Sequence, residues 1–125
     1  MATEFTIKVP DRAGQLAMLA NALGEAGVNL RSVAASKGTI GILVSDADTA
    51  KARRALKKAK YRATERKAIE VRLKDKPGAL ARSANRLGKR KVNISSTYVL
   101  APGRGNVTVA YAVKDARGAK KALGR

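Results

Sequence analysis

The first residues of the chain alternate between apolar and polar side chains. Phe5, Ile7 and Val9 are apolar, and Thr6 and Lys8 separate them. This two-residue period is typical of a strand with one buried face. The pattern predicts a β-strand that ends at a sharp turn.

The hydrophobic period then changes from two residues to that of a helix. Leu16, Leu19, Ala20 and Leu23 fall at positions i, i+3, i+4 and i+7, which line up on one side of an α-helix. We expect this helix to stop near Gly27, since glycine commonly follows a helix end.

Two strands and a second helix complete the first half. Aliphatic and β-branched residues fill 28–35 and 39–44, and the short segment between them predicts a hairpin. Asp46 or Asp48 is expected to cap the second helix. The inner face of that helix would consist of small and aliphatic residues: Ala52, Ala55, Leu56 and Ala59.

The second half repeats this order without an intervening linker. Residues 61–73 predict one long or broken strand, which closes the first half and opens the second. The remaining expected elements are a loop at 75–78, a helix through Leu80, Ala84 and Leu87, strands at 93–100 and 107–113 joined by a hairpin at 101–105, and a short helix from about Ala116.

We therefore expect two domains, 1–65 and 66–125, each of about 60 residues. The second lacks a segment for its closing strand. Three explanations stay open: a truncated chain, a strand supplied by a partner, or an open sheet edge.

A direct repeat supports the division into two domains. The segment DRAGQLAMLANALGEAGVN, 11–29, recurs 64 positions later as DKPGALARSANRLGKRKVN, 75–93, with 10 identities. Some identities are core leucines, but Asp11/Asp75 and Asn29/Asn93 are polar. Packing alone does not explain the polar identities.

The repeated motif resembles that of the ACT domain. In this chain it reads DRAGQL (11–16) with GVNL (27–30), and DKPGAL (75–80) with KVNI (91–94). The whole chain is similar to small proteins made of two ACT domains in tandem. The resemblance implies an α+β, ferredoxin-like fold: βαββαβ repeated twice, with antiparallel sheets and helices on one face, the second copy lacking its last strand. It also implies amino-acid binding, usually for regulation, and pairing of domains into larger sheets, which suggests a homodimer.

The chemistry of the motif suits an amino acid. A loop that enters a helix offers backbone N–H groups and a partial positive charge to a carboxylate. Asp and Asn side chains would accept hydrogen bonds from the ammonium group, if the strand after the helix runs beside the first strand. The alternative is that the Asp residues cap helices and the Asn residues sit in turns. The predicted ligand-binding residues are Asp11, Ala13, Gly14, Gln15, Leu16 and Asn29 in the first copy and Asp75, Pro77, Gly78, Ala79, Leu80 and Asn93 in the second.

The two copies differ at positions that affect binding. Ala13 replaces the proline found at Pro77, which makes the first loop less rigid. Lys91 replaces Gly27, which weakens the prediction of a tight turn in the second copy. Basic residues also surround the second helix. We expect the first copy to be the competent one if only one copy binds.

Composition excludes several function classes. The chain has no Cys and no His, so it has no disulfide, no thiolate metal site and no histidine base. No nucleophile with an adjacent base is visible, which makes an enzyme remote, and no metal or cofactor is expected. Neither a targeting segment nor a membrane span is apparent, so the sequence predicts a soluble cytoplasmic protein.

The formal net charge of +18 permits a second interpretation. Lysines and arginines can simply solvate the outer faces of helices, or they can attract polyanions. A basic nucleic-acid-binding module is therefore the alternative function. Its aromatic residues are few, namely Phe5, Tyr98 and Tyr111, so specific RNA recognition by stacking is not expected.

The leading hypothesis from the sequence is a non-enzymatic amino-acid sensor that acts through oligomerisation or on a metabolic enzyme in trans. The chain contains no transducing domain of its own. The sequence leaves open which amino acid binds, whether one or both copies bind it, and which partner is regulated.

Overall fold

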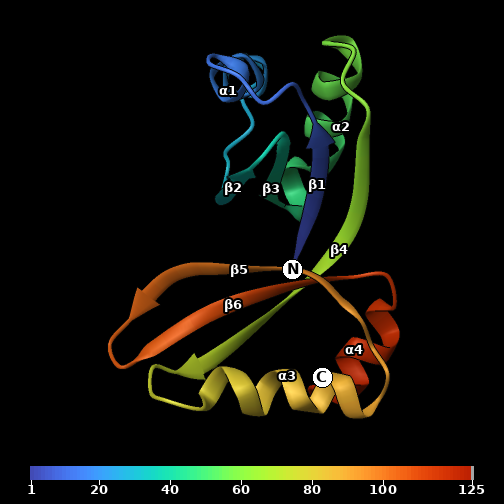
Figure 1. Ribbon diagram of the computed structural model, residues 1–125. Coiled ribbons are helices and arrows are strands. Elements are labelled where there is room, and N and C mark those ends of the chain that lie inside the picture. The colour runs from blue at the N-terminus through green and yellow to red at the C-terminus, as the bar shows by residue number, and fades with distance from the viewer. Residues whose placement is uncertain (125) are drawn as a thin grey trace. The chain divides into compact units, whose positions relative to one another are not determined.

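The computed structural model describes residues 1–124 (Figure 1). These residues form two compact units. The first unit is Ala2–Glu65, and the second consists of Met1 and the chain from Arg66 onward.

The first unit has the element order that the hydrophobic pattern predicted. Residues 28–31, predicted as strand, instead connect α1 to β2. Val28 is buried there, and its N–H bonds the Leu23 carbonyl at 3.0 Å. The elements are β1 (Ala2–Lys8), α1 (Gln15–Glu25), β2 (Ser32–Ser36), β3 (Thr39–Ser45), the 3₁₀ turn η1 (Asp46–Asp48), α2 (Thr49–Lys58) and the first residues of β4 (Ala63–Lys74).

In the sheet of the first unit, β3 lies between β2 and β1 and pairs with both in antiparallel fashion. Lys8 of β1 and Ser36 of β2 both pair with Thr39 of β3, so the end of β1 lies beside the β2–β3 turn. The start of β4 borders the other side of β1, where the Thr6 hydroxyl donates to the Thr64 carbonyl at 3.5 Å.

Both helices of the first unit cover one face of its sheet (Figure 1). Alternate residues of β1 and β3 point into the core between the layers, as the period of two requires. The buried core residues are Phe5, Ile7, Leu19, Leu23, Val28, Ile40, Ile42, Val44, Ala52 and Leu56. Burial of these aliphatic side chains stabilises the unit by about 25 cal/mol for each Å² removed from water.

The second unit repeats this plan with a longer hairpin. Its elements are the rest of β4, α3 (Ala79–Lys89), β5 (Ile94–Gly103), β6 (Asn106–Val113) and α4 (Ala116–Ala122). The strand order is β4-β6-β5, and α3 and α4 lie on one face (Figure 1). As predicted, β4 is one long strand of 12 residues. Within residues 1–124 no strand follows α4. The predicted ferredoxin-like fold class is confirmed.

The core of the second unit contains a buried hydrogen bond between two side chains. The Tyr111 hydroxyl and the Ser83 hydroxyl are both buried and form a 3.0 Å hydrogen bond between β6 and α3. Val71, Leu87, Val109 and other aliphatic residues surround the Tyr111 ring in the same cluster.

Three local predictions need correction. Asp48 stands at the N-cap of α2, one of the two positions predicted, but its side chain makes no cap bond; it accepts instead from the Asn29 N–H at 3.1 Å. Ala59 is exposed, because α2 ends one residue earlier. Lys91 does keep the turn of Gly27, with φ 58° against 76°, so a lysine adopts the left-handed conformation that glycine prefers.

Candidate ligand site at the first helix

The loop between β1 and α1 ends in a glycine with a left-handed backbone. Gly14 has φ 89° and occupies the N-cap position of α1, and the Met18 N–H makes the first helical bond to its carbonyl at 3.0 Å. No side chain caps this helix. The first-turn N–H groups have no partner inside a helix, so they can donate hydrogen bonds to an anionic ligand. The alternative role of Asp11 as a helix cap is therefore wrong.

A small cavity lies between this loop, the first turn of α1 and the β2–β3 hairpin. Its volume is about 160 Å³. A hydrogen bond of 2.8 Å from the Val9 N–H to the Gly38 carbonyl holds the end of β1 against the hairpin. Gly38 has φ 83°, and a Cβ there would lie 2.8 Å from the Val9 carbonyl oxygen. Only glycine fits this close approach without a shift of the backbone.

Three of the six predicted residues of the first copy line this cavity: Asp11, Gln15 and Leu16. Ala13 and Gly14 belong to the loop beside them and are exposed. The hairpin wall, residues 35–40, was not predicted as part of the site. Its signal in the sequence was the Lys37-Gly38 turn, which strand pairing brings next to the end of β1.

Asn29 does not lie beside Asp11, contrary to the prediction. The prediction assumed that the strand after the helix lies beside β1, but β3 lies between β1 and β2. Helix α1 also returns along the sheet before β2 begins, so Asn29 lies at the far end, where its N–H bonds Asp48. The five residues of β2 alone span roughly 16 Å between the two ends.

The same separation occurs in the second copy. Asn93 directly precedes Ile94, which pairs with Val113 at one end of the sheet. The Asp75 N–H bonds the Gly105 carbonyl at 2.9 Å at the other end. A clamp made by Asp and Asn of a single copy is therefore wrong for both copies.

The loop of the second copy has the same backbone and a different environment. Gly78 has φ 85° at the N-cap of α3, and no side chain caps that helix either. The Arg82 Nη1 atom lies 3.1 Å from the position that a Cβ of Gly78 would take, whereas nothing lies within 4 Å of the equivalent position at Gly14. Pro77 is exposed beside Gly78, and Ala79 and Leu80 form the first turn of the helix. The guanidinium of Arg82 therefore covers the second loop, and the first loop is open.

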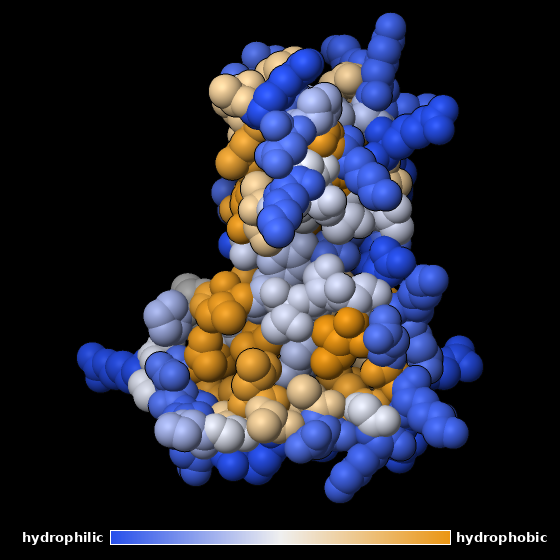
Figure 2. Space-filling view, viewed as in Figure 1, coloured by the Kyte–Doolittle hydropathy of each residue, from blue (hydrophilic) through white to orange (hydrophobic). Residues whose placement is uncertain are grey.

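Both copies expose apolar residues on the first helix and on the edge strand. Leu16 and Leu80 occupy equivalent places and are 44% and 52% exposed. Val33 and Val99 lie on β2 and β5 and are 40% and 66% exposed. Figure 2 shows hydrophobic surface on the second unit, with blue, hydrophilic side chains projecting around it.

Outside the cavity, the first unit has an ion pair at its surface. Arg53 of α2 makes two hydrogen bonds to the Glu65 carboxylate, and this pairing raises the pKa of Arg53. Among residues 1–124, no three acidic side chains gather into a group that could bind a metal ion. No helix in this described part of the chain is both long and apolar enough to cross a membrane.

These features define a class of fold: two ferredoxin-like units in tandem, each with a glycine-ended loop at its first helix. This is the fold of tandem ACT domains, which confirms the resemblance seen in the sequence. Neither the scan against protein-family models nor the search of curated proteins found a match.

Solved structures show the same fold. Protein BT0572 from Bacteroides thetaiotaomicron has a TM-score of 0.77 and 22% identity, over 98% of this chain and 85% of that one. The regulatory subunit of aspartate kinase from Thermus flavus has a TM-score of 0.70 and 18% identity, over 98% and 90% of the two chains. The ligand-free regulatory subunit of aspartate kinase from Thermus thermophilus has a TM-score of 0.73 and 18% identity, over 98% and 89%. The kinase subunits are regulatory, and these neighbours give no support to the nucleic-acid interpretation.

Proposed function

We propose that this chain is a non-enzymatic regulatory protein that binds a free amino acid in the cavity between Gly14 and the β2–β3 hairpin. The observation that carries this proposal is an uncapped helix N-terminus beside a carboxylate. The first-turn N–H groups of α1 suit the ligand carboxylate. Asp11 lines the same cavity and provides an acceptor for the ammonium group.

The size of the cavity favours a small ligand. Drug-sized ligands occupy pockets of roughly 300 to 1,000 Å³. The cavity at Gly14 has about 160 Å³. It suits an amino acid, and the apolar walls of Val9, Leu16 and Ile40 would contact the side chain of that ligand.

A second copy of the chain would complete this site. Leu16 lines the cavity and is 44% exposed, Met18 on the next part of α1 is 59% exposed, and β2 is an edge strand. A homodimer formed through α1 and β2 would cover these residues and exclude water from the ligand. It would also allow Asn29 of the other copy to take part, which its own copy does not permit.

Regulation then requires that the ligand bind one state of the assembly more tightly than another. The output acts on an enzyme in trans. Because the structural neighbours include regulatory subunits of aspartate kinase, a catalytic chain of that type is the first partner to test.

Calorimetric titration with each proteinogenic amino acid at moderate salt tests the binding. One or a few should bind saturably, and Asp11→Ala should weaken that binding at least tenfold, because the ammonium group loses a charged acceptor. The matched control is Asp75→Ala in the second loop, which should change the affinity less than twofold. The proposal would be overturned if no amino acid bound to the protein, either alone or mixed with a catalytic chain of the aspartate kinase type.

A further inference from the structure

A second and larger cavity lies on the sheet of the first unit. Its volume is about 700 Å³, more than four times that of the cavity at Gly14. It is lined by two residues of β1, one of β3 and the chain that leads from α2 into β4: Thr6, Lys8, Thr39, Lys60, Tyr61, Arg62, Ala63 and Thr64. We call it the β1–β4 groove.

Strand alternation places most of the polar lining on the sheet face away from the helices. Phe5 and Ile7 point into the core, so Thr6 and Lys8 point to the opposite face. Thr39 pairs with Lys8 and shares that face. Tyr61 packs against the core. Arg62 and Thr64 follow it at alternate positions of an extended chain, so they are expected on the side away from the core.

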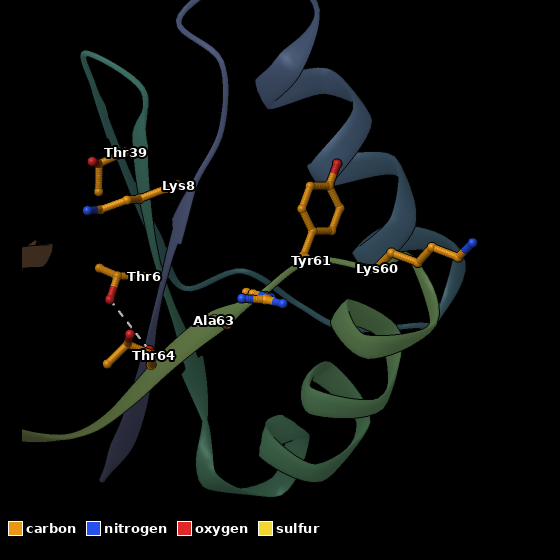
Figure 3. A pocket seen from close by; sticks show the side chains of 8 residues that line it. Thr6, Lys8, Thr39, Lys60, Tyr61, Ala63 and Thr64 are labelled. Atoms are coloured by element: carbon orange, nitrogen blue, oxygen red, sulfur yellow. Dashed lines mark hydrogen bonds between the residues drawn. The ribbon is translucent and has the colours of Figure 1, made fainter.

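Figure 3 shows how these side chains lie. Thr6, Lys8, Thr39 and Thr64 project to one side of the strands, and Tyr61 points toward the helix layer. The Lys60 side chain points away from Thr6 and Thr39, so it adds charge to the rim without facing them.

The lining carries charge of one sign. Lys8, Lys60 and Arg62 are cationic, Thr6, Thr39 and Thr64 supply hydroxyl groups, and no carboxylate belongs to the lining. Glu4 shares this face of β1 but is fully buried two residues before Thr6, outside the groove. A zwitterionic amino acid would find no carboxylate for its ammonium group in this lining, whereas an anion would find donors and positive charge.

The backbone at the groove supports the same interpretation. Lys60 has φ 65°, a left-handed conformation that a side chain other than glycine adopts at a cost of about 1 kcal/mol. Glycine would fit the end of α2 better, as Gly27 fits the end of α1 with φ 76°. A lysine at this position places a third cation at the rim of the groove.

We propose that the β1–β4 groove binds a phosphate-bearing small molecule of about nucleotide size. The volume exceeds what a single phosphate needs and lies within the range of pockets for small ligands. Guanidinium and ammonium groups beside hydroxyl donors are the groups that proteins use to bind phosphate. This site is distinct from the amino-acid site, because the residues that line the two cavities have only Thr39 in common.

Titration with ATP in the absence of divalent cations, at moderate salt, tests the proposal. ATP should bind saturably with one site per chain, tripolyphosphate should also bind, and adenosine should not. The double variant Lys8→Gln/Arg62→Gln should weaken ATP binding at least tenfold.

The matched control is Arg54→Gln/Lys58→Gln on α2, which removes the same charge from exposed positions outside the groove. It should change ATP affinity less than twofold. Equal loss in both double variants would overturn the proposal, because it would show that the field of the whole chain, and not the groove, attracts the anion.

Two further measurements keep the test decisive. Thermal unfolding should be the same for both double variants, since all four residues are exposed. Thr39→Val removes one hydroxyl without a change of charge and should weaken ATP binding about threefold. ATP binding that is unchanged in Thr39→Val and in the Lys8/Arg62 double variant would overturn the groove as the site.

Discussion

The loops before α1 and α3 have nearly the same backbone and different surroundings. Gly14 and Gly78 have φ 89° and 85° and stand at the same helix position. The first loop opens on a cavity, whereas Arg82 covers the second. The difference shows that a duplicated backbone can be kept while one side chain on the following turn changes the space around the loop.

The two units also differ in charge. Residues 66–125 contain 16 Lys and Arg against 3 Asp and Glu, and residues 1–65 contain 11 against 6. Most of the net charge of +18 therefore belongs to the unit whose loop is covered. The charge of the first unit is more balanced, but its groove gathers cations without carboxylates.

The hairpins provide the strongest test of the comparison. Gly38→Ala should lower the free energy of unfolding of the first unit by roughly 3 kcal/mol, because the new Cβ meets the Val9 carbonyl at 2.8 Å and the φ is positive. Gly105→Ala is the control in the second hairpin. Its φ is 68° but nothing lies within 4 Å of the new Cβ, so we expect a loss of about 1 kcal/mol. Urea unfolding measures both, and equal losses would contradict the close approach at Gly38.

The cores offer a second test. In the first unit Leu19 of α1 and Ile42 of β3 are apolar and buried, whereas the second unit has the Ser83–Tyr111 hydrogen bond in the corresponding helix and strand. Tyr111→Phe should cost about 1–2 kcal/mol, since the buried Ser83 hydroxyl loses its partner.

A double-mutant cycle separates this bond from packing. Ser83→Ala/Tyr111→Phe should cost about 1 kcal/mol less than the sum of the two single variants. Additive losses in urea unfolding would show that the two hydroxyl groups do not interact.

The smallest expected effect concerns the helix ends. Lys91→Gly should raise the free energy of unfolding by about 0.5 kcal/mol, because relief of the left-handed strain exceeds the entropy that glycine adds to the unfolded chain. Gly27→Lys should lower it by a similar amount. Chemical denaturation with closely spaced points measures such differences, and a stabilised Gly27→Lys would refute the equivalence of the two turns.

Much of the fold follows from local pattern. The period of two at Phe5 and Ile7 and the spacing of Leu19 and Leu23 indicated core positions, and both pairs are buried, whereas Leu16 of the same helical stripe is 44% exposed. The repeated motif predicted the tandem ACT fold. These predictions succeed because hydrophobic period and chain order decide which elements form.

The candidate site could be predicted only in part. Asp11, Gln15 and Leu16 line the cavity because they are local to the loop. Asn29 and Asn93 were misplaced because strand order, which sequence spacing does not determine, puts β3 and β6 between the strands assumed to be neighbours. The β1–β4 groove was missed for a similar reason: Thr39 and Arg62 are far apart in the sequence, and sheet pairing is what brings them to one cavity.

Strand β4 has a consequence for how the chain can be divided. Its 12 residues run from the first unit into the second as one strand, with Thr64 accepting from Thr6 and residues 67–74 paired to β6. A protease must pull an exposed segment into its cleft, and nicks concentrate at loop tips. The junction at Glu65 and Arg66 lies inside a strand and not at a loop tip, so limited digestion would cut at turns such as Arg104-Gly105 before it released the two halves as separate fragments.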